Sequence, residues 1–173
     1  MCGSDKLLFQ VGGLPLIRRL ALEALHSRAL EVIVAVGPDQ TERKSALVGT
    51  AEFGMSESLK CGIASTQPDA EGAIILLPDM PGIQTRHINT LIDGFLPGSV
   101  VQACDNRAAP GNPVILPRNL FAAIMQLTGD IGARSLIGSG RNGSILVELP
   151  GNASQTDLDT RKEWAEWRAG RIQ

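Results

Sequence analysis

The strongest constraint on the fold is a run of five apolar residues, Ala73-Ile74-Ile75-Leu76-Leu77, which stops at Pro78-Asp79. A short, continuous apolar run is typical of a β-strand that is covered on both faces. A strand of this kind needs helices on both sides of its sheet. The sequence around residues 73–79 therefore predicts an α/β protein.

Strand-like and helix-like segments alternate along the rest of the chain, which implies parallel pairing, right-handed crossovers and helices on both faces of the sheet. Strands are expected over 30–36, 73–77, 99–104, 114–116 and 144–149, and helices over 14–26, 55–65, 85–95, 118–127, 132–137 and 161–168. Pro15 suits a first-turn position, and Ser56 and Thr85 are candidate caps. The sequence contains no repeat or linker, so residues 1–173 are expected to form one domain.

Charge and composition exclude several classes of protein. The net charge is −2 and the basic residues are scattered, which argues against a nucleic-acid or membrane surface. No apolar run approaches the ~18 residues that a membrane-spanning helix needs. Cys2, Cys61 and Cys104 match no metal-binding spacing, and we expect reduced thiols in a cytoplasmic protein.

Asp79 is the first candidate for chemistry, because ligands of such sheets bind beyond the carboxyl ends of the strands. Pro78 and Pro81 restrict the backbone on either side of it. A carboxylate fixed there could bind Mg²⁺, which prefers oxygen ligands and shares them with phosphates. The alternative is that Asp79 caps a turn or the next helix.

Two glycine-containing segments are candidates for phosphate or nucleotide binding. Lys6 follows Gly3-Ser4-Asp5, and a lysine after such a loop can contact phosphate as a point charge, although it could equally be a solvated terminal charge. Gly54 and Ser58 lie around the start of the expected 55–65 helix, where backbone amides attract anions. An ordinary capped helix explains the same pattern.

Three later segments supply further polar candidates. Asn112 belongs to Gly111-Asn112-Pro113, and Arg134 could clamp a phosphate or form a surface ion pair. Asp157 and Asp159 lie two residues apart, so in an extended segment their side chains point the same way. Either could complete a metal site with Asp79, or the segment could cap the last helix.

Together and in this order, these segments resemble the MobA-like NTP transferase family, and within it the molybdenum-cofactor cytidylyltransferase branch. The matching segments cover nearly the whole chain: Gly3-Ser4-Asp5-Lys6-Leu7-Leu8, Gly12 to Arg19, Gly54 to Leu59, Leu77 to Pro81, Gly111 to Arg118, Gly129-Asp130 with Gly132-Ala133-Arg134, and Asp157 to Thr160. The ordered set is fairly specific for the superfamily and less specific for the substrate.

The resemblance implies a Rossmann-like three-layer nucleotidyltransferase fold that uses Mg²⁺. It implies transfer of a nucleotide, CMP in preference to GMP, from an NTP to the phosphate of molybdopterin, with release of pyrophosphate. Lys6 would contact phosphate with Gly3 beside it, and Asp79 would bind the metal with Asp159 or Asp157. Gly54 and Ser58 would lie near the nucleotide. Asn112 and Arg134 would face the pterin phosphate.

The start of the sequence departs from the family pattern. Relatives begin with an apolar strand and a loop of the form Leu-Ala-Ala-Gly-x-Ser-x-Arg, whereas Met1 and Cys2 stand where that loop finishes. The first strand and the glycine backbone that cradles the triphosphate are therefore missing. A downstream start, a shortened chain and a relative without turnover all fit. The intact later motifs favour the first two.

A second function remains open from the sequence. A non-catalytic protein that holds the pterin cofactor and delivers it to a molybdoenzyme would keep the Asn112 and Arg134 region and could lack the phosphate loop. A dinucleotide oxidoreductase is set aside, because no GxGxxG follows a strand. His26 and His87 have no nucleophile pattern near them, and no catalytic role is assigned to them.

Overall fold

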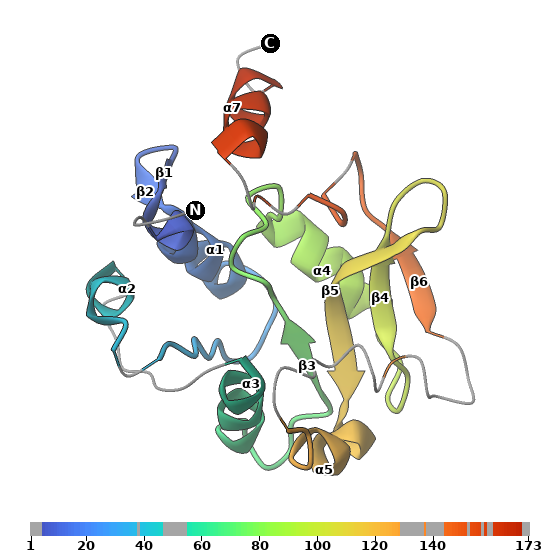
Figure 1. Ribbon diagram of the computed structural model, residues 1–173. Coiled ribbons are helices and arrows are strands. Elements are labelled where there is room, and N and C mark those ends of the chain that lie inside the picture. Colours follow the sequence, from blue (N-terminus) through green and yellow to red (C-terminus); the bar gives the residue numbers. More distant parts are fainter. Residues whose placement is uncertain are drawn as a thin grey trace.

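A four-stranded sheet lies at the centre of the described part of the chain (Figure 1). Its strands stand in the order β3 (Gly72–Ile75), β5 (Pro110–Pro117), β4 (Val101–Cys104) and β6 (Ile145–Glu148). β5 pairs antiparallel with β3 and with β4, while β4 and β6 pair in parallel. The expected parallel direction is confirmed for β3, β4 and β6. It is wrong for β5, which is reversed and longer than the expected 114–116.

The fold comes from a computed structural model that describes residues 5–37, 39–46, 55–128, 137, 144–151, 153–156, 158 and 161–170. The helices are η1 Lys6–Leu8, α1 Leu16–Leu25, α2 Thr41–Ala46, α3 Met55–Ala64, α4 Thr85–Asp93, η2 Arg118–Leu120, α5 Phe121–Ile124 and α7 Arg161–Gly170. Gly3, Gly54, Arg134, Asp157 and Asp159 lie outside the described residues, as do Cys2 and most of the expected 132–137 helix.

Helices cover both faces of the sheet, as the continuous apolar run predicted. On one face, α1 and α4 bury Leu20, Ile88 and Leu91 against Val101 and Ile115. The other face is covered by α3 and α5, and the buried residues of this second core are Ile63, Val114, Leu116, Ile124 and Leu127. Consecutive residues of β5 thus point to opposite layers. The result is the expected three-layer Rossmann-like nucleotidyltransferase fold.

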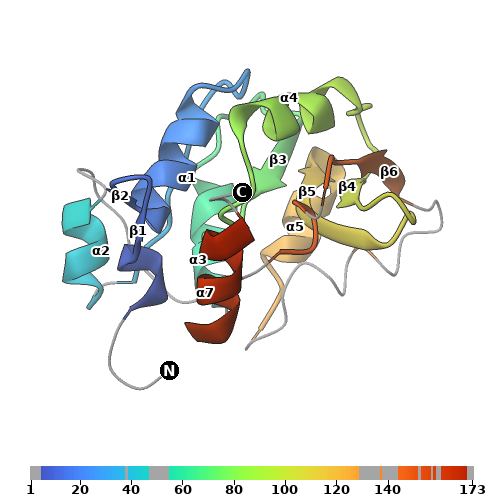
Figure 2. The ribbon, with the colours of Figure 1, turned by 90° about the horizontal axis from the view of Figure 1, so that it is seen from above.

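A small hairpin precedes α1. β1 (Gln10–Val11) and β2 (Leu14–Pro15) are joined by Gly12 and Gly13, which have φ angles of +62° and +82°. A two-residue hairpin turn of this kind needs positive φ at both positions, which explains the glycine pair. Val11 and Leu16 pack against Leu158 and Trp164, so the hairpin lies beside α7 (Figures 1 and 2).

The strand expected at 30–36 does not form. Residues 31–37 belong to no ladder, and Val32–Val36 make no backbone hydrogen bond with other described residues. The segment still packs, because Val32 contacts the α1/α4 core and Val36 is buried. β-Branched residues favour a strand only where a partner strand supplies the hydrogen bonds. β3 is likewise an edge strand on its side away from β5.

Several expected helix ends are corrected. Gln84, not Thr85, caps α4, and Thr85 instead donates its hydroxyl to the backbone oxygen of Glu23 at 3.0 Å. Pro15 lies just before α1 rather than in its first turn, and Ser56 lies inside α3 rather than at its cap. The expected 118–127 helix is split into η2 and α5, which ends at Ile124.

Leu25, the last residue of α1, is apolar but 63% exposed. An α-helix turns by about 100° per residue, so Leu25 lies about half-way round the helix from Leu16. Among the described helices, none is long and apolar enough to cross a bilayer.

Candidate functional site

Asp79 lies in a turn at the carboxyl end of β3. The turn is closed by a hydrogen bond from the Met80 amide to the Leu77 oxygen at 3.4 Å, and Met80, Pro81 and Ile83 are buried beneath it. The apolar anchors fix the backbone, while the Asp79 side chain keeps 21% exposure. The sequence prediction that a carboxylate is held at this end of the strand is consistent with this geometry.

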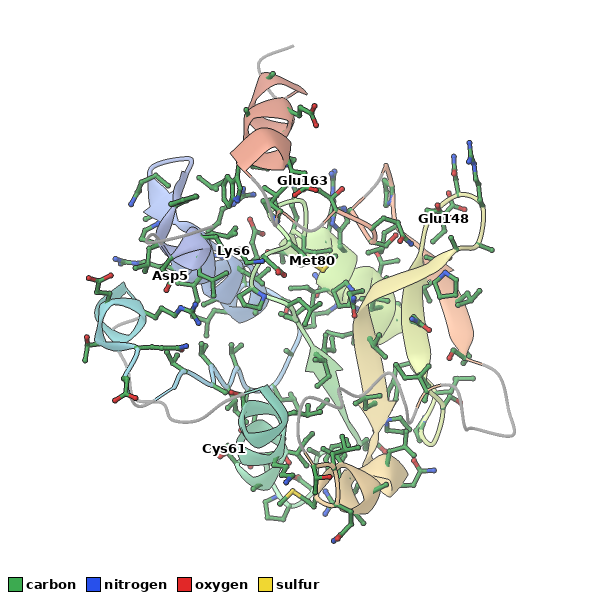
Figure 3. The ribbon with its side chains drawn as sticks, viewed as in Figure 1. Asp5, Lys6, Cys61, Met80, Glu148 and Glu163 are labelled. Carbon is green, nitrogen blue, oxygen red and sulfur yellow. The ribbon has the colours of Figure 1, made fainter. Side chains whose placement is uncertain are left out.

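Lys6 reaches Asp79 from the N-terminal segment. Its Nζ lies 2.9 Å from Asp79 Oδ2, and the two side chains are 27% and 21% exposed. Lys6 opens η1, where the carboxylate of Asp5 accepts the Leu7 amide at 3.1 Å and Leu7 is buried. Figure 3 shows Lys6 beside Met80, the neighbour of Asp79. The structure thus brings together the two residues to which the sequence assigned catalytic roles.

The second oxygen of Asp79 differs from the first. Oδ1 is buried and has no hydrogen-bond partner among the described residues. Leaving a buried carboxylate oxygen unpaired costs free energy, which a cation or an N–H donor would offset. A hard divalent cation is suited to this oxygen, because such cations prefer oxygen ligands.

Asp79 is joined by no ready-made carboxylate cluster in the described ranges, which hold no group of three or more His, Cys, Asp or Glu. The backbone of a later segment does reach the backbone of Asp79, since the Leu158 N–H donates to the main-chain carbonyl oxygen of Asp79 at 3.2 Å. Asp157 and Asp159 flank Leu158 in the sequence, and both lie outside the described residues. Their expected metal role stays a prediction.

Asp5 and Arg43 form a support for Lys6 that the sequence analysis missed. Arg43 Nη2 donates to Asp5 Oδ1 at 3.0 Å, and Arg43 Nε donates to Oδ2. Burial by itself raises the pKa of Asp5, but the hydrogen bonds from Arg43 and the Leu7 amide outweigh it and leave the pKa below its usual range. Arg43 lies in α2, a polar helix whose sequence contains no recognisable motif. The sequence signal for this ion pair was therefore limited to Asp5, the acidic residue next to Lys6.

Asn112 lies near the start of β5 and is half-buried. Its main-chain N–H donates to the main-chain carbonyl oxygen of Ser154 at 2.9 Å. Gln102 Nε2 donates to the main-chain oxygen of the neighbouring Gly111 at 3.1 Å. The sequence analysis treated residues 111–113 as a polar cluster and placed the strand later. The cluster instead lies within β5, which begins at Pro110 and pairs there with Cys104 of β4.

Of the other expected site residues, the structure describes Asn112 and Ser58. Ser58 lies in the first turn of α3 and is half-buried. Gly3, Gly54 and Arg134 lie outside the described residues. His87 is buried in the capping of α4, where its Nδ1 accepts the Gln84 amide at 3.3 Å. Burial and the nearby Arg86 lower the pKa of His87.

Solved structures share this architecture. A homologue of Mycobacterium tuberculosis Rv0371c from Mycobacterium sp. strain JC1 is 25% identical, with 98% of this chain and 90% of that chain covered and a TM-score of 0.83. Rv0371c in complex with manganese is 22% identical, with coverage of 93% and 89% and a TM-score of 0.77. A nucleotidyl transferase from Methanothermobacter is 18% identical, with coverage of 96% and 85% and a TM-score of 0.78. These likenesses show that the chain has the nucleotidyltransferase fold.

The family follows from the sequence match. Residues 1–144 match the model of the MobA-like NTP transferase domain. The chain is also 29% identical over 150 residues to the purine catabolism protein PucB of Bacillus subtilis, which covers 84% of this chain and 72% of PucB. This protein belongs to the MobA-like NTP transferase domain family.

Proposed function

We propose that this protein transfers a nucleotide, CMP in preference to GMP, from an NTP to the terminal phosphate of a molybdopterin-type acceptor. A phosphate oxygen of the acceptor attacks the α-phosphorus, a new phosphoanhydride bond forms, and the bond to the β-phosphate breaks with release of pyrophosphate. The observation that carries this proposal is the pairing of Lys6 with Asp79, whose second carboxylate oxygen is buried without a partner in the described part of the chain. Positioning and charge neutralisation are what such a reaction requires.

In this proposal, each residue has a role that follows from its chemistry. Lys6 is a point charge that binds the phosphates of the NTP, with Gly3 beside it, and Asp5 and Arg43 hold the segment from which it projects. Gly54 and Ser58 lie on the nucleotide side, and Asn112 and Arg134 orient the acceptor phosphate.

Asp79 would hold a Mg²⁺ ion, with Asp159 or Asp157 as the second ligand. When bound, the divalent cation neutralises charge on the phosphates and on departing pyrophosphate. The manganese complex of Rv0371c, a relative of the same fold, supports a divalent cation in such a protein. Support for nucleotide binding comes from CMP:2-keto-3-deoxy-manno-octonic acid synthetase, a structure of the same fold that was solved with CTP.

Ligand-dependent thermal stability tests the proposal, because a ligand that binds the native state raises its melting temperature by mass action. CTP with Mg²⁺ is expected to raise Tm more than GTP with Mg²⁺, and CTP with molybdopterin is expected to release pyrophosphate. A response to molybdopterin together with indifference to both nucleotides would support the delivery protein instead. A protein that responds to none of these ligands would refute both functions.

A further inference from the structure

One short segment touches both sides of the proposed site. The segment comprises the described residues 153–156 and 158, and it is called the strap below. At one end, the Ser154 oxygen accepts the Asn112 amide at 2.9 Å. At the other end, the Leu158 N–H donates to the main-chain carbonyl oxygen of Asp79 at 3.2 Å. The strap therefore contacts both the turn that carries Asp79 and the start of β5, the strand that pairs with β3.

Gly111 permits the close approach of the strap to β5. A Cβ atom at Gly111 would lie 2.0 Å from the Ser154 oxygen, far inside van der Waals contact. The atom it would meet is a backbone oxygen, which cannot swing aside as the end of a side chain could. The Gln155 side chain adds a second tie, since its Nε2 donates to the Ala109 oxygen at 2.8 Å.

The strap is anchored by burial as well as by hydrogen bonds. Ala153 and Ser154 are 8% and 2% exposed, and Ala153 belongs to the core between α1, α4 and the sheet. Leu158 is 2% exposed and packs with Leu16 and Trp164 in the separate cluster beneath α7. The described residues of the strap are therefore held in two different clusters, Ala153 in one and Leu158 in the other.

We propose that the strap sets the position of the acceptor relative to the nucleotide, with Ser154 and Leu158 as positioning residues. The inference rests on the proposed function, because it takes Asp79 as the nucleotide and metal side and Asn112 as the acceptor side. Transfer requires the two phosphates to meet within about 3–3.5 Å, and an error of about 1 Å can cost about 100-fold in rate. The backbone of the strap is hydrogen-bonded to both sides, at Asn112 and at Asp79.

A pair of glycine substitutions tests the strap. Gly111→Ala places a Cβ on the Ser154 oxygen, whereas Gly82→Ala is the matched control, because its Cβ would lie 3.6 Å from Ala153 Cα in ordinary contact. Gln155→Ala is a milder variant that removes only the side-chain tie. The measurements are kcat and KM for molybdopterin at saturating CTP and Mg²⁺, the Kd of CTP with Mg²⁺, and amide hydrogen exchange.

If the strap positions the acceptor, the variants should impair the use of molybdopterin while leaving CTP binding unchanged. For Gly111→Ala, kcat/KM for molybdopterin falls by about 10-fold to 100-fold, while the Kd of CTP with Mg²⁺ stays within about threefold, a change of roughly 0.7 kcal/mol by RT ln 3. Gly82→Ala behaves as the wild type. For Gln155→Ala, kcat/KM for molybdopterin falls by about threefold to tenfold, the range expected for the loss of one hydrogen bond. An equal loss for both substrates, or no loss, would overturn the positioning role.

Hydrogen exchange separates failure of the strap from failure of the proposed function. In the wild type the Asn112 and Leu158 amides are expected to exchange slowly, and in Gly111→Ala only Asn112 is expected to exchange faster. A wild-type protein with rapid exchange at both amides would refute the strap whatever its activity. An inactive wild type with the expected exchange pattern would refute the proposed function, and the positioning role with it.

Discussion

Lys6 Nζ and Asp79 Oδ2 lie 2.9 Å apart although 73 positions separate the two residues in the sequence. The pair joins the segment before the hairpin to the turn after β3. Partly exposed ion pairs contribute little to folding. The pairing is therefore better explained by what the two groups bind than by stability.

Lys6→Met separates these two roles. The free energy of unfolding is expected to change by no more than about 1 kcal/mol, because the pair is partly solvated. The affinity for CTP with Mg²⁺ is expected to fall by about tenfold or more, since a charge-assisted contact to phosphate is lost. Urea unfolding and calorimetric titration measure the two quantities, with Arg28→Met as a surface-charge control. A large loss of stability with unchanged affinity would contradict the assignment.

Asp5 should confer an acid-dependent part of the stability. Its pKa is lowered in the folded state, so the stabilisation is present above the ordinary pKa of an aspartate and is lost as the pH falls through the folded value. Urea unfolding of the wild type and of Asp5→Asn at pH 7, 4 and 3 measures this. The stability difference between the two proteins should shrink below about pH 4. A difference that is constant with pH would rule out the Arg43 pairing as its cause.

His87 should make the protein sensitive to a milder acidity. Its pKa is lowered by burial and by Arg86, with Glu23 acting in the opposite direction, so the unfolded chain binds a proton first as the pH falls. Stability is therefore retained above pH 6.5, the ordinary value, and declines from there toward the folded pKa. His87→Gln, which keeps an acceptor for the Gln84 amide, should flatten the profile between pH 7 and 5. Identical slopes for the two proteins would disprove this.

In the described part of the chain, the backbone of Val32–Val36 and the outer edge of β3 have no strand partner, which predicts the effect of adding a strand. An extension upstream of Gly3 that carries an apolar strand and a glycine-rich loop is expected to raise Tm, because it supplies hydrogen-bond partners to half-buried backbone. Amide exchange at Ile33 and Ile74 should slow, and the affinity for CTP should rise. The control is the same extension with proline in the strand. Equal Tm and exchange for both extensions would show that no strand adds here.

The sequence analysis located Asp79 because strand ends in α/β proteins are the places where ligands bind. It also found the alternation that yields three layers, since the apolar periods of α1 and α4 are strong. It could not show that Lys6 meets Asp79, because the pairing depends on the path of the chain between them. Arg43 was missed for the same reason: its contact with Asp5 spans 38 positions.

Other predictions were wrong because they used the local preference of a residue for a strand, loop or cap without knowing which residues would contact it in the fold. Residues 30–36 have the composition of a strand, but no described strand pairs with them. β5 was expected to be short because Gly111 and Asn112 resemble a loop, whereas Gly111 is needed for the close approach of Ser154. Thr85 is a good cap by type, yet Glu23 binds its hydroxyl and Gln84 takes the cap.

The central claim is that Asp79 binds a divalent cation together with the NTP. Titration of Mn²⁺ and CTP into the wild type and Asp79→Asn tests it most directly, with Asp93→Asn as a control that removes only a surface carboxylate paired with Arg28. The account predicts that the wild type and Asp93→Asn bind alike and that Asp79→Asn binds about 100-fold more weakly or not at all, because it loses a direct ligand. Equal affinity for Asp79→Asn and the wild type would contradict the account.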